Sequence, residues 1–356
     1  MGLFGFGKKP GLGIDISSDA IRAIELLPTA DSYTVARVAS VTLPKKLIVD
    51  DEITDLEGLT KALTQLRKQS GTAVKQVVAA VSGSQAISKQ VLMASDLDDE
   101  AISEKIETEA EALIPFPIAE VRYDFESLGE HATMAGQQRV LVTATRTISV
   151  DTRVQALEDA GFKTQVMDVD NQAILRACDH LLPQLAPEIV ASPHPILVLD
   201  IGYAAVQIIV IQQGEVIFTR YQSGGLNNLL GAIDDDGAIE HAQLMAKLRA
   251  NETDDMSALV LQDFLASMAA QVTRGIQTFQ GNSAEKEFAG VVVINAGATL
   301  PLMLDSIRKQ VEVPVLALNP FEQFALPDKL VHFHYQGPLF VEAFGLALRS
   351  FVPWHM

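Results

Sequence analysis

The sequence predicts a two-lobed α/β fold with an inserted subdomain, and three observations lead to this prediction. The 356 residues exceed the usual length of a single hydrophobic core. A pattern of strand, tight turn, strand and strand occurs at 11–43 and returns from residue 195. Between the two repeats, a block rich in strands interrupts the alternation of strands and helices. The predicted domains are a first lobe (1–85 with 161–190), the inserted subdomain (86–160), a second lobe (195–225 with 290–356) and a helical subdomain of the second lobe (226–289).

Composition and charge exclude several classes of protein. Hydrophobic residues make up 48% and charged residues 20% of the chain, which is typical of a globular protein. A formal net charge of −18 argues against a nucleic-acid partner, because proteins that bind phosphate backbones concentrate Lys and Arg. Cys178 is the single cysteine, so no intramolecular disulfide can form, and no apolar run is long enough for a membrane helix. We therefore expect a cytoplasmic protein.

The first lobe begins with three predicted strands that form a meander. Its strands read GLGIDIS, IRAIELL and YTVARVASVTLP, with turn-forming residues between them. Leucines then recur at helical spacing in 55–70, and Gly71 ends that pattern. The continuous apolar run at 76–82 is typical of a buried strand, so a helix connects the third strand to a fourth.

The inserted block contains three predicted strands and an acidic helix. Strands are expected at 86–94, 121–129 and 139–146, and a polar turn makes the last two a hairpin. The helix at 96–113 keeps Ile102 and Ile106 on one stripe, so its carboxylates are expected on a solvated face. The IPFP segment after it cannot continue a helix. Helix, strand and helix at 149–185 then restore the α/β alternation.

The second lobe repeats the opening of the first in PILVLDIGYAAVQIIVIQQGEVIFTRYQ. Two helical segments with a long apolar stripe are expected at 226–249 and 257–280. A buried strand and a glycine turn follow in GVVVINAGATLP, then a helix, a strand and a final helix at 337–351. The second unit therefore has the same architecture as the first, and not only one motif in common.

The two hairpins predict a nucleotide site. A strand that ends in Asp and is followed by a small residue at a tight turn lets backbone N–H groups approach a phosphate, while the carboxylate faces bound magnesium. Asp15 and Asp200 hold this position in the two repeats, and the turn at 296–298 is the third element. Two phosphate hairpins and a loop under adenosine form the arrangement of the actin, Hsp70 and sugar-kinase superfamily. The expected ligands are ATP and Mg²⁺, with Asp15 and Asp200 beside the metal.

Longer stretches carry a closer resemblance. The quoted stretches are GIDISSDAIRAIEL, EAEALIPFPIAEVRYDFESLG, VLVTATRTISVDTRVQALEDAGF, MDVDNQAILRA, LNPF and FGLALRSF. From end to end the sequence resembles the PilM family, the actin-like cytoplasmic proteins of bacterial type IV pilus assembly. The resemblance implies the fold shared with the division protein FtsA, in which a small subdomain is displaced from its position in actin.

The resemblance also implies partners and a location. The implied partner is the N-terminal cytoplasmic tail of a PilN-type inner-membrane protein, which would hold the chain at the membrane. PilO, PilP, motor ATPases and a second copy of the chain are further candidate partners. An extended apolar tail is expected to bind the inserted subdomain by strand addition or in an apolar groove. The acidic helix at 98–112 would steer basic residues of the tail.

The motifs and the resemblance together name the candidate site. Asp170 is the candidate catalytic residue, because an acid at this place orients the attacking water in Hsp70-type relatives; a helix N-cap is the alternative role. The candidate nucleotide-binding residues are Gly13, Asp15, Ser17, Ser18, Arg22, Asp200, Gly202, Gly224, Gly225, Glu240, Lys247, Ala296, Gly297 and Ala298.

Several of these positions depart from the superfamily pattern. Tyr203, Ala204 and Ala205 supply no small hydroxyl in the second hairpin, Ala296 replaces a glycine, and Lys247 lies one position late. An added methyl group can deny a ligand its approach to the backbone, so we expect ATP binding to be weakened and hydrolysis to be slow at most.

Two alternatives remain at this stage. A small-molecule kinase of the same fold would need a general base for the acceptor hydroxyl, and the sequence offers no convincing one. An FtsA-like division filament protein would carry an amphipathic membrane segment in its tail, and this sequence stops soon after GLALRSF. We therefore expect a pilus scaffold.

Overall fold

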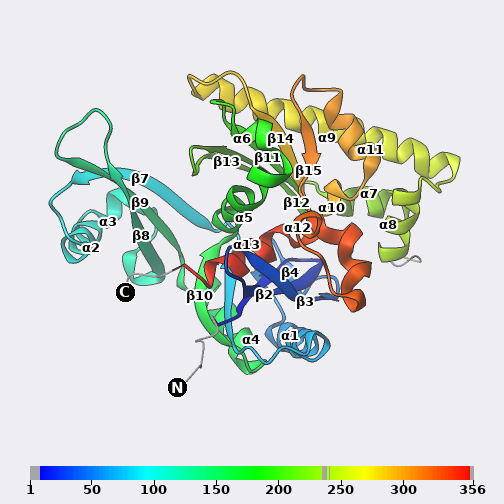
Figure 1. The fold of residues 1–356 in the computed structure, drawn as a ribbon, viewed down its shortest axis with the longest axis horizontal. Helices are drawn as coiled ribbons and strands as arrows, with labels where there is room; N and C mark the ends of the chain where they lie inside the picture. The colour runs from blue at the N-terminus through cyan, green and yellow to red at the C-terminus, as the bar shows by residue number, and fades with distance from the viewer. Residues whose placement is uncertain (1–8, 235–238, 240, 353–356) are drawn as a thin grey trace.

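The computed structural model describes residues 9–234, 239 and 241–352, and shows two lobes with a smaller sheet set to one side (Figure 1). The first lobe is built on a five-stranded sheet in the order β10-β6-β1-β2-β3. Neighbours along the meander are antiparallel, whereas β6 is parallel to both β1 and β10. The strands are β1 (Gly11–Ile16), β2 (Ala20–Pro28), β3 (Tyr33–Thr42), β6 (Gln76–Val81) and β10 (Lys163–Val169).

The second lobe repeats this topology. Its sheet has the order β13-β12-β11-β14-β15, with an antiparallel meander and two parallel strands. Read from β15 to β13, this sheet has the same strand directions as the first sheet read from β10 to β3. The agreement confirms the predicted repeat and the two-lobed fold. The strands are β11 (Ile196–Ile201), β12 (Ala205–Gln212), β13 (Glu215–Ser223), β14 (Gly290–Ile294) and β15 (Val315–Ala317).

The first helix, α1 (Leu56–Ser70), begins and ends where its caps predict. The side chain of Asp55 accepts a hydrogen bond from the backbone N–H of Gly58 (2.8 Å), and Gly71 ends the helix in the left-handed region (φ 60°). The buried leucines of α1 share a core with β1 and with α4 (Thr147–Asp159). The short strands β4 (Ile48–Val49) and β5 (Glu52–Ile53) precede α1.

Two helices lie between the sheets of the lobes: α5 (Asp170–Leu185) and α13 (Val341–Arg349) (Figure 1). One buried apolar cluster joins Ile24 of β2, Ile174 of α5, Val198 of β11 and Phe344 of α13. The lobes therefore share a core and are not independent hydrophobic units. The short helices α6 (Pro187–Val190) and α12 (Pro320–Gln323) also belong to this region. The predicted final helix starts as the 3-10 helix η2 (Asp328–Phe340), and α-helical geometry begins only at Val341.

The inserted subdomain is an antiparallel sheet in the order β7-β9-β8, seen at the left of Figure 1. Its strands are β7 (Ala86–Ala94), β8 (Val121–Glu130) and β9 (Gln137–Arg146), and the 3-10 helix η1 (Ile118–Glu120) precedes β8. The predicted acidic helix is divided at Glu109 into α2 (Asp99–Thr108) and α3 (Ala110–Leu113). A small core of its own, which includes Ile102, Ile106 and Val140, holds α2 on the sheet.

The expected end of this subdomain at residue 160 lies one helix too late. The sheet ends with β9 at Arg146, and α4 packs on the first lobe, where Ala156 and Leu157 are buried with Leu63 of α1. Helical periodicity alone cannot say which sheet a helix covers, which explains the difference.

The helical subdomain of the second lobe comprises α7 (Leu226–Ile233), α8 (His241–Ala250) and α9 (Asp255–Asn282). Leu230, Met245 and Val272 from these three helices pack with Ile208 of β12 in one buried cluster. After β14, the chain forms the short helix α10 (Asn295–Ala298) and then α11 (Pro301–Arg308).

Candidate nucleotide cleft

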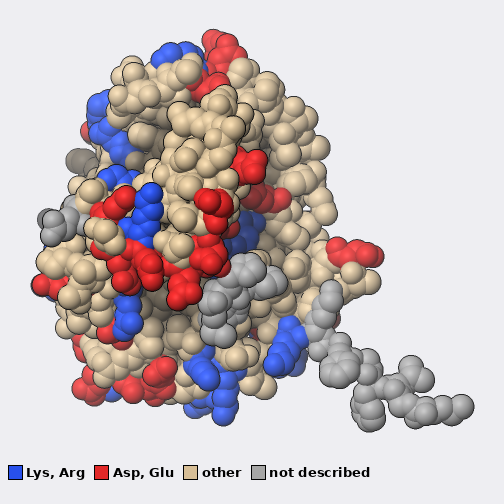
Figure 2. All heavy atoms as spheres, turned by 90° about the vertical axis from the view of Figure 1, so that its left-hand side faces the viewer, with Lys and Arg blue, Asp and Glu red and all other residues tan. Residues whose placement is uncertain are grey.

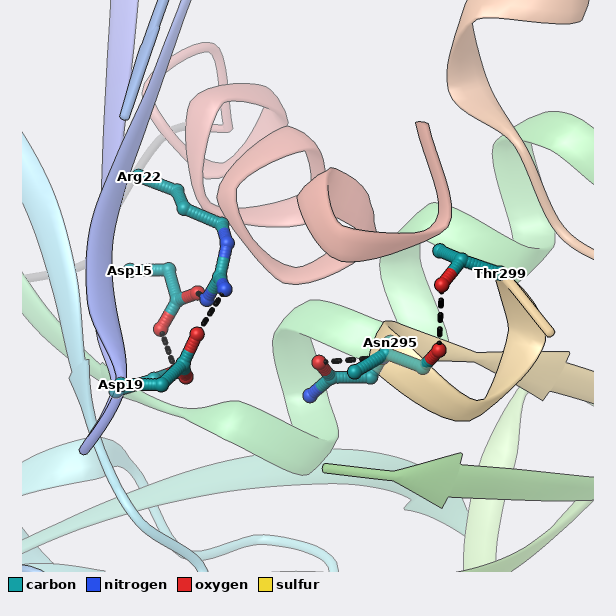
Figure 3. Close-up of polar contacts among 7 residues, drawn as sticks. Asp15, Asp19, Arg22, Asn295 and Thr299 are labelled. Atoms are coloured by element: carbon teal, nitrogen blue, oxygen red, sulfur yellow. Dashed lines mark hydrogen bonds and ion pairs between the residues drawn. The ribbon is translucent and has the colours of Figure 1, made fainter. Parts of the chain in front are cut away.

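The two predicted hairpins face each other across a cleft between the lobes. The turns after β1 and after β11 line it, together with the start of α5 and Asn295 of α10. Figure 3 shows Asp15, Asp19 and Arg22 on one side and Asn295 with Thr299 on the other. The cleft is narrow, with a volume of about 110 Å³.

The first hairpin holds a buried ionic network. Asp15 pairs with Arg22 in the register of β1 and β2, and the Arg22 guanidinium lies 3.5 Å from Asp15 and in contact with Asp19 (Figure 3). The hydroxyl of Ser17 donates to Asp15 Oδ1 (2.6 Å). Burial raises the pKa of Asp15 to about 6, although Arg22 and Ser17 act against this shift. Burial works against the charge of Arg22, but Asp19 and Asp15 outweigh it and raise the pKa of the guanidinium.

The second hairpin presents Asp200 at the end of β11. Burial raises the pKa of Asp200 to about 7; a hydrogen bond from Asn295 opposes this, and the charges of Asp170 and Asp15 add to it. Asn295 holds a left-handed backbone conformation (φ 64°) at the start of α10. Asp200 Oδ1 is buried and has no hydrogen-bond partner among the described residues. A buried carboxylate oxygen without a partner is costly, so this atom fits a site that receives a cation or a water molecule.

Asp170, the first residue of α5, occupies the end of the cleft between the hairpins. Its carboxylate accepts hydrogen bonds from the backbone N–H groups of Gly83 and Asn171 and from the hydroxyl of Tyr221 (3.2 Å). Burial raises its pKa to about 6, and the two backbone hydrogen bonds lower it. The N-cap alternative is wrong, because Val169 is the N-cap residue of α5 and Asp170 is already its first helical residue. Asp170 does line the cleft.

Sequence reasoning missed several side chains that line the cleft, among them Arg153, Tyr203, Tyr221 and Glu342. Glu342 lies in the first turn of α13, and burial, followed by the charges of Asp15, Asp170 and Asp200, raises its pKa well above the ordinary value. In the sequence, Glu342 reads as an ordinary position of an amphipathic helix, so no local signal marks it. For Tyr203, the sequence indicated only that a small hydroxyl side chain is absent from the second hairpin.

The structure brings some predicted site residues together and leaves others elsewhere. The predicted residues that line the cleft are Asp15, Ser17, Ser18, Asp170, Asp200 and Gly202. Arg22 does not line it but contacts Asp15, which does. Glu240 lies outside the described residues. The remaining predicted residues, which do not line the cleft, are Gly13, Gly224, Gly225, Lys247, Ala296, Gly297 and Ala298.

Packing explains why most of these residues lie elsewhere. A Cβ atom on Gly13 would lie 2.2 Å from the carbonyl oxygen of Ala343, so the glycine serves the approach of α13. The N–H groups of Gly224 and Gly225 are both bonded to the carbonyl oxygen of Ala204. Residues 296–298 are buried, with Gly297 against the side chain of Ile201.

The predicted lysine is also displaced. Lys247 is exposed on α8, and Arg249 takes the inward position, where it donates to the hydroxyl of Thr299 (3.1 Å). Two residues further along a helix change the direction of a side chain by about 200°. A one-position shift in the sequence was therefore a signal that the side chain could point elsewhere.

No group of three or more His, Cys, Asp or Glu side chains in the described part of the chain is arranged to bind a metal ion directly. Within the same residues, no helix is both long and apolar enough to cross a membrane.

Two sheets of identical topology around a cleft lined by acidic hairpins define an actin-like protein. Solved structures whose folds are similar to that of this chain agree with this class. The PilM–PilN type IV pilus biogenesis complex matches at 24% identity and TM-score 0.79, over 96% of this chain and 99% of that one. The ethanolamine utilization protein EutJ from Carboxydothermus hydrogenoformans matches at 14% identity and TM-score 0.57, over 96% and 90%. MreB5 of Spiroplasma citri bound to ADP matches at 12% identity and TM-score 0.50, over 96% of both chains.

The family model for type IV pilus assembly protein PilM matches residues 13–351, and the chain belongs to this family. This match confirms the resemblance described above and favours the pilus reading over a division protein or a kinase.

Proposed function

We propose that the chain is a cytoplasmic actin-like scaffold of the type IV pilus inner-membrane complex, held at the membrane by the N-terminal tail of a PilN-type protein. The family match over residues 13–351 carries this proposal. The similarity to a structure described as a PilM–PilN complex supports the choice of partner.

The inserted subdomain has the features that an extended apolar tail needs. Its two outer strands, β7 and β8, each pair on one side only, so both leave backbone groups for strand addition. At the end of the sheet nearest α4, Ile118 (38% exposed) precedes β8 and Ile148 (64% exposed) follows β9. These two residues lie at the same end, because Val121 pairs with Arg146. We place the apolar contacts of the tail here.

Charge on the inserted subdomain would assist the encounter. Asp98, Asp99, Glu100, Glu104 and Glu107 are exposed along α2 and its cap. Figure 2 shows that acidic side chains gather on this face of the molecule. Basic residues of the tail would be attracted at long range, so binding should weaken with salt while the apolar contacts persist.

The experiment compares recruitment of the purified chain to vesicles that carry a full-length PilN-type protein. Ile118→Asp and Ile148→Asp should each reduce recruitment at least about tenfold, because a charge cannot be buried in an apolar contact. Met134→Asp is the matched control, since Met134 is 51% exposed in the turn at the other end of the sheet. Equal losses in all three variants would reject the site, and recruitment by a PilN-type protein without its tail would reject the partner.

We further propose that ATP with magnesium binds in the cleft and is hydrolysed slowly at most. The unpartnered Asp200 Oδ1 supports this, together with the convergence of Asp15 and Asp200 from opposite lobes. Magnesium, when bound, would offset the charge of the phosphates. Asp15 and Asp200 would hold it through water, and Arg22 would face the phosphates. Asp170 would orient an attacking water molecule.

Calorimetry with Mg-ATP tests this second part. Asp15→Ala and Asp200→Ala should weaken binding, and Lys247→Ala, an exposed residue outside the cleft, should leave it unchanged. A wild-type chain that binds no nucleotide at millimolar concentration would reject nucleotide binding. Turnover of about one per second or faster would reject slow hydrolysis.

A further inference from the structure

Tyr221 connects the two lobes across the cleft. It extends from β13 of the second lobe, opposite Gln207 of β12, and its hydroxyl contacts Asp170 Oδ1 of the first lobe at 3.2 Å. The side-chain amide of Gln207 donates to the same hydroxyl. The phenol can therefore accept from its own lobe and donate to the other.

The first lobe leaves a space for this hydroxyl at Gly83, and we call this space the seat. A Cβ atom on Gly83, in the loop after β6, would lie 1.9 Å from Tyr221 Oη and 2.7 Å from Asp170 Oδ1. Any residue other than glycine would therefore displace the phenol. The backbone N–H of Gly83 also bonds to Asp170, so one loop positions both the acceptor and the space for its donor.

Tyr203 occupies the second hairpin where the superfamily has a small hydroxyl residue. It lines the cleft, and Asp19 and Arg22 of the first lobe are close enough for their charges to act on its hydroxyl. Its backbone is fixed, because the carbonyl oxygens of Gly202 and Tyr203 accept the N–H groups of Leu226 (3.0 Å) and Asn227 (2.8 Å). The Tyr203 hydroxyl is thus within electrostatic reach of Arg22, the guanidinium that the proposed function turns toward a phosphate.

We propose that Tyr221 latches the second lobe onto Asp170 and that Tyr203 fills the phosphate position, so that the chain holds its cleft closed without nucleotide. The volume of about 110 Å³ agrees with this, since ligand pockets usually measure about 300–1,000 Å³. That the latch competes with a nucleotide rests on the proposed function. That the cleft is closed without nucleotide does not depend on it. A nucleotide would have to displace both phenols before it could enter.

The first test measures the distance between the lobes without nucleotide. Cys178 is the chain's single cysteine and is buried, so two surface cysteines can be spin-labelled selectively. Lys68→Cys on α1 and Glu252→Cys after α8 place one exposed label on each lobe. Wild type should give one narrow distance distribution by pulsed electron paramagnetic resonance.

Two unrelated substitutions should open the cleft. Tyr221→Phe removes the hydroxyl, and Gly83→Ala keeps every hydroxyl but fills the seat. Each should raise the ratio of long to short distances about tenfold, the effect of losing one hydrogen bond to a charged group. Tyr123→Phe is the matched control, because its hydroxyl bonds to Ser103 (3.1 Å) and Glu107 (3.0 Å) in the inserted subdomain. Unchanged distances in both Tyr221→Phe and Gly83→Ala would overturn the latch, whatever nucleotide does.

The second test adds Mg-ATP to the Tyr203→Ser, Tyr221→Phe double variant. Calorimetry should show binding at least about tenfold tighter than in wild type, because the cost of displacing the latch is gone. Equal affinity in the two proteins would overturn the competition between latch and nucleotide. If the variant opens but binds no nucleotide at millimolar concentration, the proposed nucleotide function is wrong and the latch on the closed state is supported.

Discussion

Replacing Gly13 by Ala should destabilise the whole fold, and this is the most direct test of how the first lobe is built. Gly13 lies in β1 between Ile24 of β2 and Val78 of β6. Its φ angle is not positive, so alanine meets no backbone strain there. The added Cβ, however, would lie 2.2 Å from the carbonyl oxygen of Ala343 and 2.3 Å from the backbone nitrogen of Ala347.

The expected magnitude follows from what surrounds α13. Ordinary contacts of a Cβ atom begin near 3.4 Å, so the helix would have to move away by more than about 1 Å. It cannot do so freely, because on its other side Gly345 lies against α5, where a Cβ would be 1.8 Å from the carbonyl oxygen of Ala173. Overpacking usually costs about 1–3 kcal/mol, and two rigid backbones place this case near 3 kcal/mol.

Urea unfolding followed by circular dichroism measures the change. Gly231→Ala is the control: Gly231 lies inside α7, nothing lies within 4 Å of its Cβ position, and alanine should be neutral or stabilise by up to about 1 kcal/mol. A Gly13→Ala protein that unfolds at the wild-type urea concentration would refute the packing argument. If a Gly13→Ala protein of wild-type stability bound Mg-ATP more weakly than wild type, the result would favour the sequence-based assignment of Gly13 to the nucleotide site.

Three further outcomes are expected. Because burial raises the pKa of Asp200 to about 7 in the folded state, from 3.8, the stability that its neutral form gives is present below about pH 4 and lost as the pH rises to about 7. The urea midpoint of wild type should therefore fall more between about pH 5 and pH 8 than that of Asp200→Asn, and parallel curves would contradict the shift. Asp55→Ala removes the cap bond to Gly58 and should cost about 1 kcal/mol in urea unfolding; a change below about 0.3 kcal/mol would reject the cap. Arg139 of β9 bonds to both carboxylate oxygens of Glu215 of β13 (2.7 and 2.9 Å), and a double-mutant cycle with alanine should give a coupling energy of about 1 kcal/mol, with additive changes as the contrary result.

The sequence was sufficient for features that depend on neighbouring residues. The doubled sheet follows from strand alternation and turn residues, which are local signals, and Asp15 and Asp200 follow from where those strands end. The acidic helix was also predicted, but its division at Glu109 was not, because the apolar stripe continues across the break.

Contacts between distant segments could not be predicted in this way. Tyr221 and Asp170 are 51 positions apart, and nothing near either residue indicates the other. The packing role of Gly13 was missed for a related reason. It lies two residues before Asp15, on the same face of β1, and only the structure shows that α13 covers Gly13 and brings Glu342 near Asp15.

The position of α13 also determines when, during synthesis, the core of the first lobe can be completed. The first strand of the described chain, β1, packs against its last described helix, α13. The clusters that bury Ile24 and Val78 include Phe344 and Leu346 of this helix. During synthesis, β1 and β2 emerge long before α13 has been made. Their apolar face therefore stays uncovered until residues 341–349 have been translated. The first lobe therefore begins before the second lobe in the chain, yet its core is complete only after α13 has been synthesised. A nascent chain cut short before residue 341 would lack α13, the helix that shares one core with strands of both lobes.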